Sequence, residues 1–189
     1  MRVIAGSARS LRLQTPSGSD VRPTTDRIKE TLFNILSPSL YDCDFLDIFA
    51  GSGGIGIEAL SRGAGSAVFI ENAAPSLACI NANLEHTGLK DRATVLRSDA
   101  VLGIERLFSL GRRFDIIFMD PPYGRLLEKQ VLECILTHPI LKENGIIVAE
   151  ALADTDFEYL NGTDLRVYRE KCYGSNKHVF IRAEYDAKL

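Results

Sequence analysis

Short apolar runs alternate with segments of helical periodicity through the middle of the chain. The apolar runs predict five strands, at residues 45–49, 67–70, 93–96, 114–119 and 146–149. Apolar positions three and four residues apart predict helices between them, at residues 55–62, 75–86, 101–110 and 126–137. The fourth strand is almost entirely apolar, as expected of a parallel strand that is covered on both faces. This alternation predicts a doubly wound α/β sheet that binds its ligands at the carboxyl ends of the strands.

The two ends of the chain do not follow this alternation. Residues 2–5 and 11–14 are expected to form two short strands around a Gly-Ser turn, followed by a loop at residues 16–20. Thr24 or Thr25 can then cap a helix that ends at Ser37-Pro38. Near the C-terminus, residues 165–172 and 178–183 are expected to form a closing hairpin. We therefore predict two parts, an N-terminal hairpin and helix extension over residues 1–40 and the main domain over residues 41–189.

The composition is that of an ordinary globular domain. Of the 189 residues, 46% are hydrophobic and 25% are charged, which excludes a disordered chain or a fibre. No apolar stretch reaches the roughly 18 residues of a membrane span. The four cysteines are far apart and form no Cys-x-x-Cys pair, which argues for reduced thiols and against a metal site. We therefore expect a cytoplasmic protein with no metal and no membrane partner.

The net charge of −3 hides two basic segments. The N-terminal segment contains a single acid, Asp20, and four arginines: Arg2, Arg9, Arg12 and Arg22. The second segment, near the C-terminus, contains Arg166, Arg169, Lys171 and Lys177. Either segment alone fits an ordinary solvated surface. Together, on an otherwise acidic chain, they indicate that any contact with RNA is local.

A glycine-rich turn follows the first predicted strand. Gly51, Gly53 and Gly56 fit the pattern Gly-x-Gly-x-x-Gly, and Glu71 lies 20 residues after Gly51, at the end of the second strand. The glycines allow a tight turn into a helix and a close approach of the backbone to a ligand, while the acid can bind ribose hydroxyls. This pattern predicts a nucleoside cofactor, which can be NAD or S-adenosylmethionine.

Two further acids help to separate these cofactors. Asp47 lies inside the first strand, where a negative charge opposes a pyrophosphate but attracts the amino group and sulfonium of S-adenosylmethionine. Asp99 follows the third strand, where it can accept from the adenine amino group, cap the helix that begins at Val101, or do both. Acids at three consecutive strand ends favour S-adenosylmethionine over NAD.

The chemical signature is Asp120-Pro121-Pro122-Tyr123, directly after the fourth strand. An exocyclic amine on a base is a weak nucleophile because its lone pair is delocalised into the ring. The Asp120 carboxylate and the Pro121 carbonyl can accept the two amine hydrogens, and the prolines hold these acceptors in place. Tyr123 offers a flat face on which an extruded base can stack. Alone, the tetrapeptide also fits a rigid turn; with the glycine loop it predicts an amino-methyltransferase.

With both motifs in place, the chain resembles the amino-methyltransferases that carry Asp/Asn-Pro-Pro-Tyr/Phe at this position and act on DNA adenine, on RNA adenine or guanine, or on some protein amides. Within that group it resembles the bacterial 16S ribosomal RNA guanine-N2 methyltransferases of the RsmD type. The resemblance covers essentially the whole chain. It also rests on residues 2–6 (RVIAG), 21–27 (VRPTTDR), 29–34 (KETLFN), 47–53 (DIFAGSG) and 58–63 (EALSRG). The chain departs from the family pattern at residues 7–10 (SARS), where members often carry an aromatic or basic residue and a glycine.

The resemblance implies a Rossmann-like class I methyltransferase fold, with a mostly parallel seven-stranded sheet flanked by helices and a small N-terminal hairpin that helps to bind RNA. It implies methyl transfer from S-adenosyl-L-methionine to N2 of one guanine in the 16S rRNA of the small ribosomal subunit. The cofactor residues expected on this basis are Asp47, Phe49, Gly51, Ser52, Gly53, Gly56, Glu71, Asn72, Asp99 and Ala100. The residues expected to contact RNA, from this resemblance and from the basic N-terminus, are Arg9, Arg12, Arg22, Pro23, Thr24 and Arg27. Asp120 to Tyr123 are expected to position the guanine amine.

Three alternatives share part of this pattern. An adenine-N6 methyltransferase acting on DNA or RNA has the same cofactor loop and the same motif after the fourth strand. A NAD-dependent oxidoreductase uses the same glycine pattern but has no use for Asp120 to Tyr123. A non-catalytic RNA-binding module would not need that motif either. The RNA substrate can be free 16S rRNA, a partly assembled small subunit or a mature one.

Overall fold

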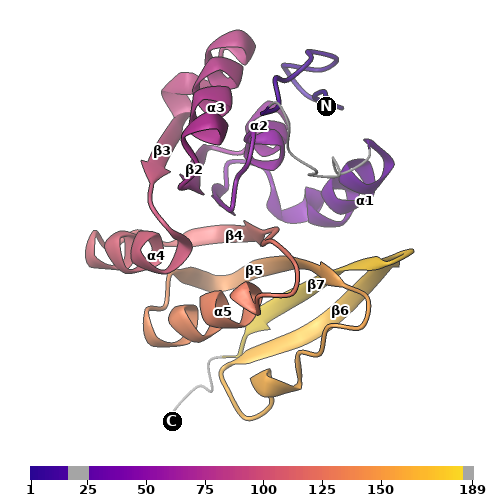
Figure 1. Cartoon of the computed structure of the whole chain (residues 1–189), viewed down its shortest axis with the longest axis vertical. Coiled ribbons are helices and arrows are strands. Elements are labelled where there is room, and N and C mark those ends of the chain that lie inside the picture. Colours follow the sequence, from indigo (N-terminus) through magenta and orange to yellow (C-terminus); the bar gives the residue numbers. More distant parts are fainter. Residues whose placement is uncertain (17–25, 185–189) are drawn as a thin grey trace.

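A computed structural model describes residues 1–16 and 26–184 of the chain. In this part, seven strands form one sheet in the order β3-β2-β1-β4-β5-β7-β6, which confirms the predicted fold class (Figure 1). The strands are β1 (Asp44–Ile48), β2 (Ser66–Glu71), β3 (Ala93–Arg97), β4 (Phe114–Met119), β5 (Leu141–Leu152), β6 (Leu165–Tyr173) and β7 (Asn176–Ala183). Neighbouring strands from β3 to β5 are parallel, and β7 pairs antiparallel with both β5 and β6.

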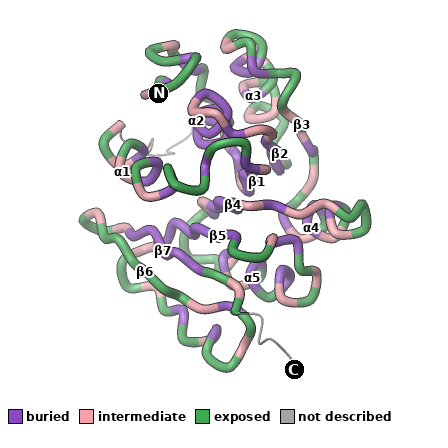
Figure 2. Tube along the Cα trace, turned by 180° about the vertical axis from the view of Figure 1, so that it is seen from behind, coloured by how far each residue is buried: buried purple, intermediate pink, exposed green. Residues whose placement is uncertain are grey.

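Helices cover both faces of the sheet, and each face has its own hydrophobic cluster. One cluster contains side chains of α1 (Asp26–Leu36), α2 (Gly54–Ser61) and α3 (Ala74–Thr87). The other contains side chains of α4 (Ala100–Ser109) and α5 (Leu127–Thr137). Short 3-10 turns lie at Ser37–Ser39, Lys90–Arg92 and Glu158–Leu160. Buried positions gather in the central strands and α2, whereas β6 at the edge is mostly exposed (Figure 2).

The strand order places a ligand site between β1 and β4. From β1 the chain moves to β2 and β3 on one side, and it returns to the other side of β1 as β4. In open α/β sheets, ligands bind outside the carboxyl ends of the strands where the order reverses in this way. The glycine-rich turn follows β1 and Asp120 follows β4, so both predicted motifs lie at this point.

The predicted strands at residues 2–5 and 11–14 are wrong. The two segments meet at a single antiparallel bridge between Arg2 and Arg12. Beyond it, the amides of Ile4 and Ala5 donate to the carboxylate of Glu58 in α2 instead of to a partner strand. The segment is therefore a hairpin-shaped loop that is held by a helix. The expected helix cap, Thr24 or Thr25, lies outside the described residues.

The last parallel strand is longer than predicted. The sequence Glu143-Asn144-Gly145 is typical of a turn before the predicted strand at residues 146–149, yet these three residues lie inside the bounds of β5. The turn persists as an irregularity, because Asn144 has a positive φ of 63° and the register against β4 shifts between Phe114 and Ile116. The strand begins earlier because Leu141 already pairs with Phe114.

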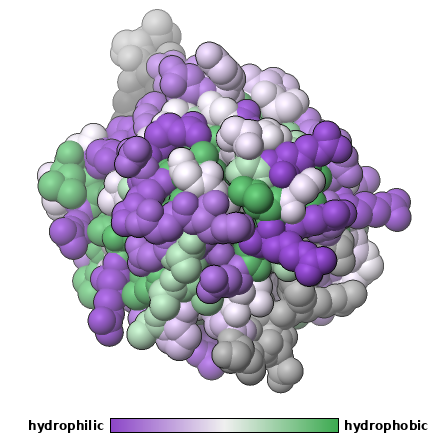
Figure 3. Space-filling model, turned by 90° about the horizontal axis from the view of Figure 1, so that it is seen from above, coloured by the Kyte–Doolittle hydropathy of each residue, from purple (hydrophilic) through white to green (hydrophobic). Residues whose placement is uncertain are grey.

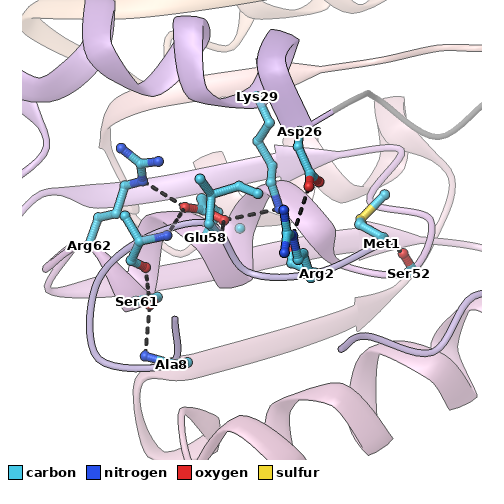
Figure 4. A network of polar contacts seen from close by, with 12 residues as sticks. Met1, Arg2, Ala8, Asp26, Lys29, Ser52, Glu58, Ser61 and Arg62 are labelled. Carbon is cyan, nitrogen blue, oxygen red and sulfur yellow. Dashed lines mark hydrogen bonds and ion pairs between the residues drawn. The ribbon is translucent and has the colours of Figure 1, made fainter. Parts of the chain in front are cut away.

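A buried ion pair attaches the N-terminal loop and α1 to α2 (Figure 4). Lys29 and Glu58 are both fully buried, with Nζ 3.0 Å from Oε2. Lys29 also donates to the Arg2 carbonyl, and Glu58 receives a second cation, Arg62, at 2.7 Å. Burial lowers the pKa of Lys29, although the charge of Glu58 opposes this shift. Within the first 40 residues, the described segments 1–16 and 26–40 thus contribute to the same core as the sheet, and the separate role of this part stays a prediction.

The face of the molecule seen from above is mostly polar (Figure 3). In the view from above, hydrophilic residues dominate and hydrophobic ones form only small areas between them (Figure 3). Within the described residues, no helix is both long enough and apolar enough to span a bilayer.

Candidate active site

The turn after β1 is built from backbone conformations that suit glycine. Gly51 and Gly53 have φ values of 55° and 78°, and Gly53 precedes the first residue of α2. Gly56 is required for a different reason, because a Cβ at this position would lie 2.4 Å from the ring of Phe69. Phe49 also has a positive φ, of 62°, which is costly for an aromatic residue and recurs at functional sites. The turn is therefore held tightly against β2.

Asp47 lies beneath this turn. Its side chain is buried, and Oδ2 accepts a hydrogen bond of 2.8 Å from the amide of Gly56. Burial raises the pKa of Asp47 well above its ordinary value, the bond from Gly56 opposes this rise, and the charges of Asp120 and Glu71 add to it. The carboxyl group therefore shapes the loop, and a cation bound above the loop would favour its ionised form.

Glu71 is fixed at the end of β2 by three backbone donors. Its Oε2 accepts from the amide of Gly51, and its Oε1 accepts from the amides of Asn72 and Ala73, each at 2.8 Å. These bonds link the end of β2 to the glycine loop and orient the carboxylate before any ligand arrives. The remaining lone pairs suit the two hydroxyls of a ribose.

A cavity of about 290 Å³ lies beside Glu71 at the carboxyl ends of the strands. Five of the predicted cofactor residues line it: Phe49, Glu71, Asn72, Asp99 and Ala100. Asp99 also caps α4, because its Oδ1 accepts from the amide of Leu102 at 3.0 Å. Asp99 can thus cap α4 and face the cavity at the same time. The other predicted cofactor residues do not line the cavity; they lie in β1 (Asp47), in the turn after it (Gly51, Ser52 and Gly53) and in the first turn of α2 (Gly56).

The structure brings Asp120 beside the glycine loop. In the parallel pair of β1 and β4, Ile48 lies opposite Met119, so the next residues, Phe49 and Asp120, leave the sheet side by side. Burial and the negative charge of Glu150 raise the pKa of Asp120 to about 8. A neutral carboxyl group still accepts through its carbonyl oxygen, and a cation bound nearby would favour its ionised form.

Tyr123 is anchored by its hydroxyl while its ring stays accessible. The hydroxyl donates to Glu150 Oε1 at 3.1 Å and accepts from the side-chain amide of Asn176. The residue is 43% exposed, so a base can stack on the ring. Glu150 in turn accepts from Asn176 and lies 3.2 Å from Nε2 of His178. Burial alone would raise the pKa of Glu150, but the contacts with His178, Asn176 and Tyr123 outweigh it and lower the pKa.

Several residues of the site were not predicted from the sequence. Arg125 and Gln130 line the cavity from the loop after Tyr123 and from α5. Glu150, Asn176 and His178 support Tyr123 from β5 and β7. No motif marks them, because they meet only through the pairing of distant strands. Only Glu150 could have been found from the sequence, because it is a polar residue directly after the fifth predicted strand.

The residues expected to contact RNA lie partly outside the described chain. Arg9, Arg12 and Arg27 are exposed, and none of the three forms a salt bridge within residues 1–16 and 26–184. Arg22, Pro23 and Thr24 are not among the described residues. The structure therefore leaves the RNA contacts of this segment as a prediction.

One group of side chains could in principle hold a metal ion. Ligand atoms of Glu105, Cys134 and His138 lie within 4.8 Å of one another on α4 and α5. Burial and the charge of Glu105 raise the pKa of the Cys134 thiol to about 11, and Nδ1 of His138 lies 3.0 Å from the Thr137 hydroxyl. A protonated thiol is a poor ligand, and none of the three residues lines the cavity. The absence of a metal stays a prediction.

Comparison with known proteins places this geometry in a family. The family model described as "Conserved hypothetical protein 95" matches residues 1–182. The chain is 38% identical over 174 residues to "Putative rRNA methyltransferase YlbH" of Bacillus subtilis, covering 92% of this chain and 94% of the relative. It is 37% identical over 189 residues to "Ribosomal RNA small subunit methyltransferase D" of Escherichia coli K12, covering 97% and 90%.

A solved structure shows the same fold. "Putative methyltransferase yhhF from Escherichia coli" superposes with a TM-score of 0.82 at 32% sequence identity, covering 97% of this chain and 98% of that one. Both the sequence match and the structural match run from the N-terminal loop to the last strand. The chain therefore belongs to the family described as Conserved hypothetical protein 95, and its predicted likeness to the RsmD-type methyltransferases is confirmed.

Proposed function

We propose that this chain transfers a methyl group from S-adenosylmethionine to the exocyclic N2 amine of a guanine in small-subunit ribosomal RNA. The observation that carries the proposal is the juxtaposition of Asp120 and the glycine loop, which follows from the pairing of Ile48 with Met119. This arrangement places an amine-binding motif beside a nucleoside-binding loop. The relatives named for methylation of ribosomal RNA support the choice of substrate.

The residues at the strand ends fit S-adenosylmethionine. Glu71 is oriented for the ribose, and the cavity beside it, which Phe49 and Asp99 line, has room for an adenine. Asp47 and Asp120 are carboxyl groups near the loop whose pKa values are raised by burial, and the sulfonium and amino group of the cofactor would favour their ionised forms there. When bound, the cofactor supplies an electrophilic methyl group. The negative pyrophosphate of a dinucleotide would instead be repelled by these two carboxyl groups in their ionised forms.

The Asp-Pro-Pro-Tyr segment supplies the chemistry on the nucleic-acid side. The Asp120 carboxylate and the Pro121 carbonyl accept the two hydrogens of the amine, which turns its lone pair toward the methyl group. As the new carbon–nitrogen bond forms, the carbon–sulfur bond to the methyl group would break with its electron pair left on sulfur. The nitrogen then becomes acidic and gives up one hydrogen as a proton, for which Asp120 is the nearest proposed acceptor. Tyr123 holds the base by stacking, while Glu150 and Asn176 hold Tyr123.

Binding and transfer assays test this proposal and its rivals. We expect calorimetry to show binding of S-adenosylmethionine and not of NADH, and we expect a labelled methyl group to appear in 16S rRNA and not in duplex DNA. Binding of NADH alone would support an oxidoreductase. Cofactor binding without transfer to any nucleic acid would favour a non-catalytic module, and transfer to DNA would favour the adenine-N6 alternative.

The raised pKa of Asp120 predicts a proton release. Without ligand this pKa is about 8, so the carboxyl group is mostly protonated at pH 7. A nearby sulfonium favours the ionised form, so cofactor binding at pH 7 should release close to one proton, and the affinity should rise from pH 6 to pH 8. Calorimetry in two buffers of different ionisation enthalpy measures the release. Equal heats in both buffers, or a release that is undiminished in Asp120→Asn, would contradict the assignment.

The basic N-terminal segment is proposed to contact RNA phosphates. Replacing Arg9, Arg12 and Arg22 with Ala should weaken RNA binding and flatten its dependence on salt by roughly two units of slope. Cofactor affinity should stay the same, since Arg9 and Arg12 do not line the cavity. Filter binding at several salt concentrations gives both quantities, and an unchanged RNA affinity would refute this role for residues 1–40.

A further inference from the structure

The second basic segment of the chain lies on the β6–β7 hairpin, and strand register sorts its side chains by face. Residues directly opposite each other in an antiparallel pair project to the same face, as do alternate residues along a strand. In this hairpin Tyr173 lies opposite Asn176, Lys171 opposite His178, and Arg169 opposite Phe180. All six side chains therefore project from one face of the hairpin.

A bulge adds an aromatic residue and a further cation to this face. The register shifts between Val167 and Arg169, so Tyr168 is an extra residue in β6. Its ring centroid lies 6.3 Å from that of Phe180, and the guanidinium of Arg182 lies 4.3 Å from the Tyr168 ring. Tyr168 is 42% exposed. We refer to Tyr168, Arg169, Lys171 and Arg182 as the hairpin track.

The cations of the track are free of carboxylate partners within residues 1–16 and 26–184. Arg169 and Arg182 lie over aromatic rings, and Lys171 is exposed. None of these three side chains forms a salt bridge with a described carboxylate. On the opposite face of the same hairpin, Lys177 is paired with Glu170 at 3.0 Å. On one face of the hairpin the positive charge of Lys177 is therefore balanced by Glu170. On the other face Arg169, Lys171 and Arg182 carry three positive charges that can contact an anionic ligand.

The track leads to the proposed active site. His178, which shares its face, lies 3.2 Å from Glu150, and Asn176 at the hairpin end donates to the hydroxyl of Tyr123. From Arg182 to Asn176 the strand spans about 20 Å, at about 3.3 Å per residue. Exposed cations and an aromatic ring therefore extend outward from Tyr123 over a length that several nucleotides can occupy.

We propose that the hairpin track binds single-stranded RNA next to the target base, with Arg169, Lys171 and Arg182 at phosphates and Tyr168 stacked on a neighbouring base. This proposal rests on the proposed function, since it assigns a path to the RNA that the Asp120 site would methylate. The chemistry is that of non-specific single-strand sites, in which cations follow the backbone and aromatic rings carry the bases.

The test is a charge-neutral triple variant, Arg169→Gln, Lys171→Gln and Arg182→Gln, with a 16S rRNA transcript as the probe. Its Kd should rise about tenfold or more near physiological salt, and the slope of log affinity against log salt should fall by about two units, as expected for three single-strand phosphate contacts. The KM for RNA should rise with little change in kcat, and cofactor affinity should be unchanged. A matched control, Lys90→Gln, Arg106→Gln and Arg113→Gln, removes the same charge from η2 (Lys90–Arg92), α4 and the loop before β4.

Two single variants keep the test independent of folding. Lys171→Glu changes an exposed side chain that has no hydrogen bond or ring contact to lose within the described residues, and it should weaken RNA binding on its own. Tyr168→Phe should bind RNA like the wild type, whereas Tyr168→Ser should lose about fivefold or more through lost stacking.

The outcomes separate this inference from the function beneath it. If the wild type methylates RNA while the triple variant and Lys171→Glu bind the transcript normally, the track is wrong and the function stands. An equal loss in the control variant would mean that only net charge matters, which also overturns the track. A loss seen with assembled subunits but not with the bare transcript would assign the face to a protein partner instead. If the wild type methylates no nucleic acid at all, the proposed function itself fails.

Discussion

Replacing Asp120 with Ala is expected to slow methyl transfer by about 100- to 1,000-fold, the usual cost of removing one preorganised polar contact to a transition state. In the proposed mechanism the carboxylate holds one hydrogen of the amine, and the methyl group of Ala offers no acceptor in its place. Asp120→Asn keeps an acceptor oxygen and should retain more activity than Asp120→Ala. Single-turnover transfer of a labelled methyl group measures both rates without interference from product release.

Cofactor binding distinguishes a chemical role of Asp120 from a structural one. The cavity proposed to accept the adenosine is lined by other residues, so both variants should still bind S-adenosylmethionine. Asp91→Ala, which removes an exposed acid from a 3-10 turn, serves as the control and should be fully active. If Asp120→Ala transferred methyl groups at the wild-type rate, the assignment of the Asp-Pro-Pro-Tyr segment would be wrong.

Replacing Lys29 with Ala is expected to lower the free energy of unfolding by about 3–5 kcal/mol, as is typical when one partner of a buried ion pair is removed. Lys29 and Glu58 are fully buried, so the remaining carboxylate would lose one of its two cations. Arg62 is still paired with Glu58 and softens the loss, which places the expected value toward the lower end of that range. Urea unfolding followed by circular dichroism measures the change.

An exposed pair in the same region provides the matched control. Arg2 and Asp26 form a salt bridge of 2.8 Å, with side chains 58% and 45% exposed. Removing the Arg2 side chain should cost at most about 1 kcal/mol, because exposed pairs are screened by water and salt. Equal effects of Lys29→Ala and Arg2→Ala would show that the buried pair does not secure the N-terminal loop to α2.

The sequence predicts the parts of this protein that depend on local pattern. The alternation of β1 to β5 with the helices follows from short apolar runs and helical spacing, and both motifs of the site occur as continuous segments. Periodicity also locates the closing hairpin of β6 and β7, because turn residues separate its two strands. These features need no knowledge of the partner across the sheet.

Features that depend on distant partners are not predicted from the sequence. The N-terminal residues alternate as strands do, yet the amides of Ile4 and Ala5 bond to Glu58, more than fifty residues away. Lys29 is a charged residue in a helix, where a solvent-exposed side chain would be expected. No local pattern shows that it is buried in an ion pair with Glu58. The support of Tyr123 by Glu150 and Asn176 likewise arises from the pairing of β5 with β7.

The position of the hairpin track illustrates the same limit. The sequence shows four basic residues near the C-terminus, and a solvated surface is a sufficient explanation for them. Strand register then separates Lys177, which is paired with Glu170, from Arg169 and Lys171, which project from the face of the active site. Only the three-dimensional arrangement turns a basic segment into a candidate path for RNA.

Mass spectrometry of nucleosides tests the central claim most directly. The enzyme is incubated with 16S rRNA and S-adenosylmethionine that carries a labelled methyl group, and the RNA is then digested to nucleosides. A single measurement identifies both the base and the atom that received the label. The account predicts labelled N2-methylguanosine, lost in Asp120→Ala. Labelled N6-methyladenosine, or no labelled nucleoside at all, would contradict it.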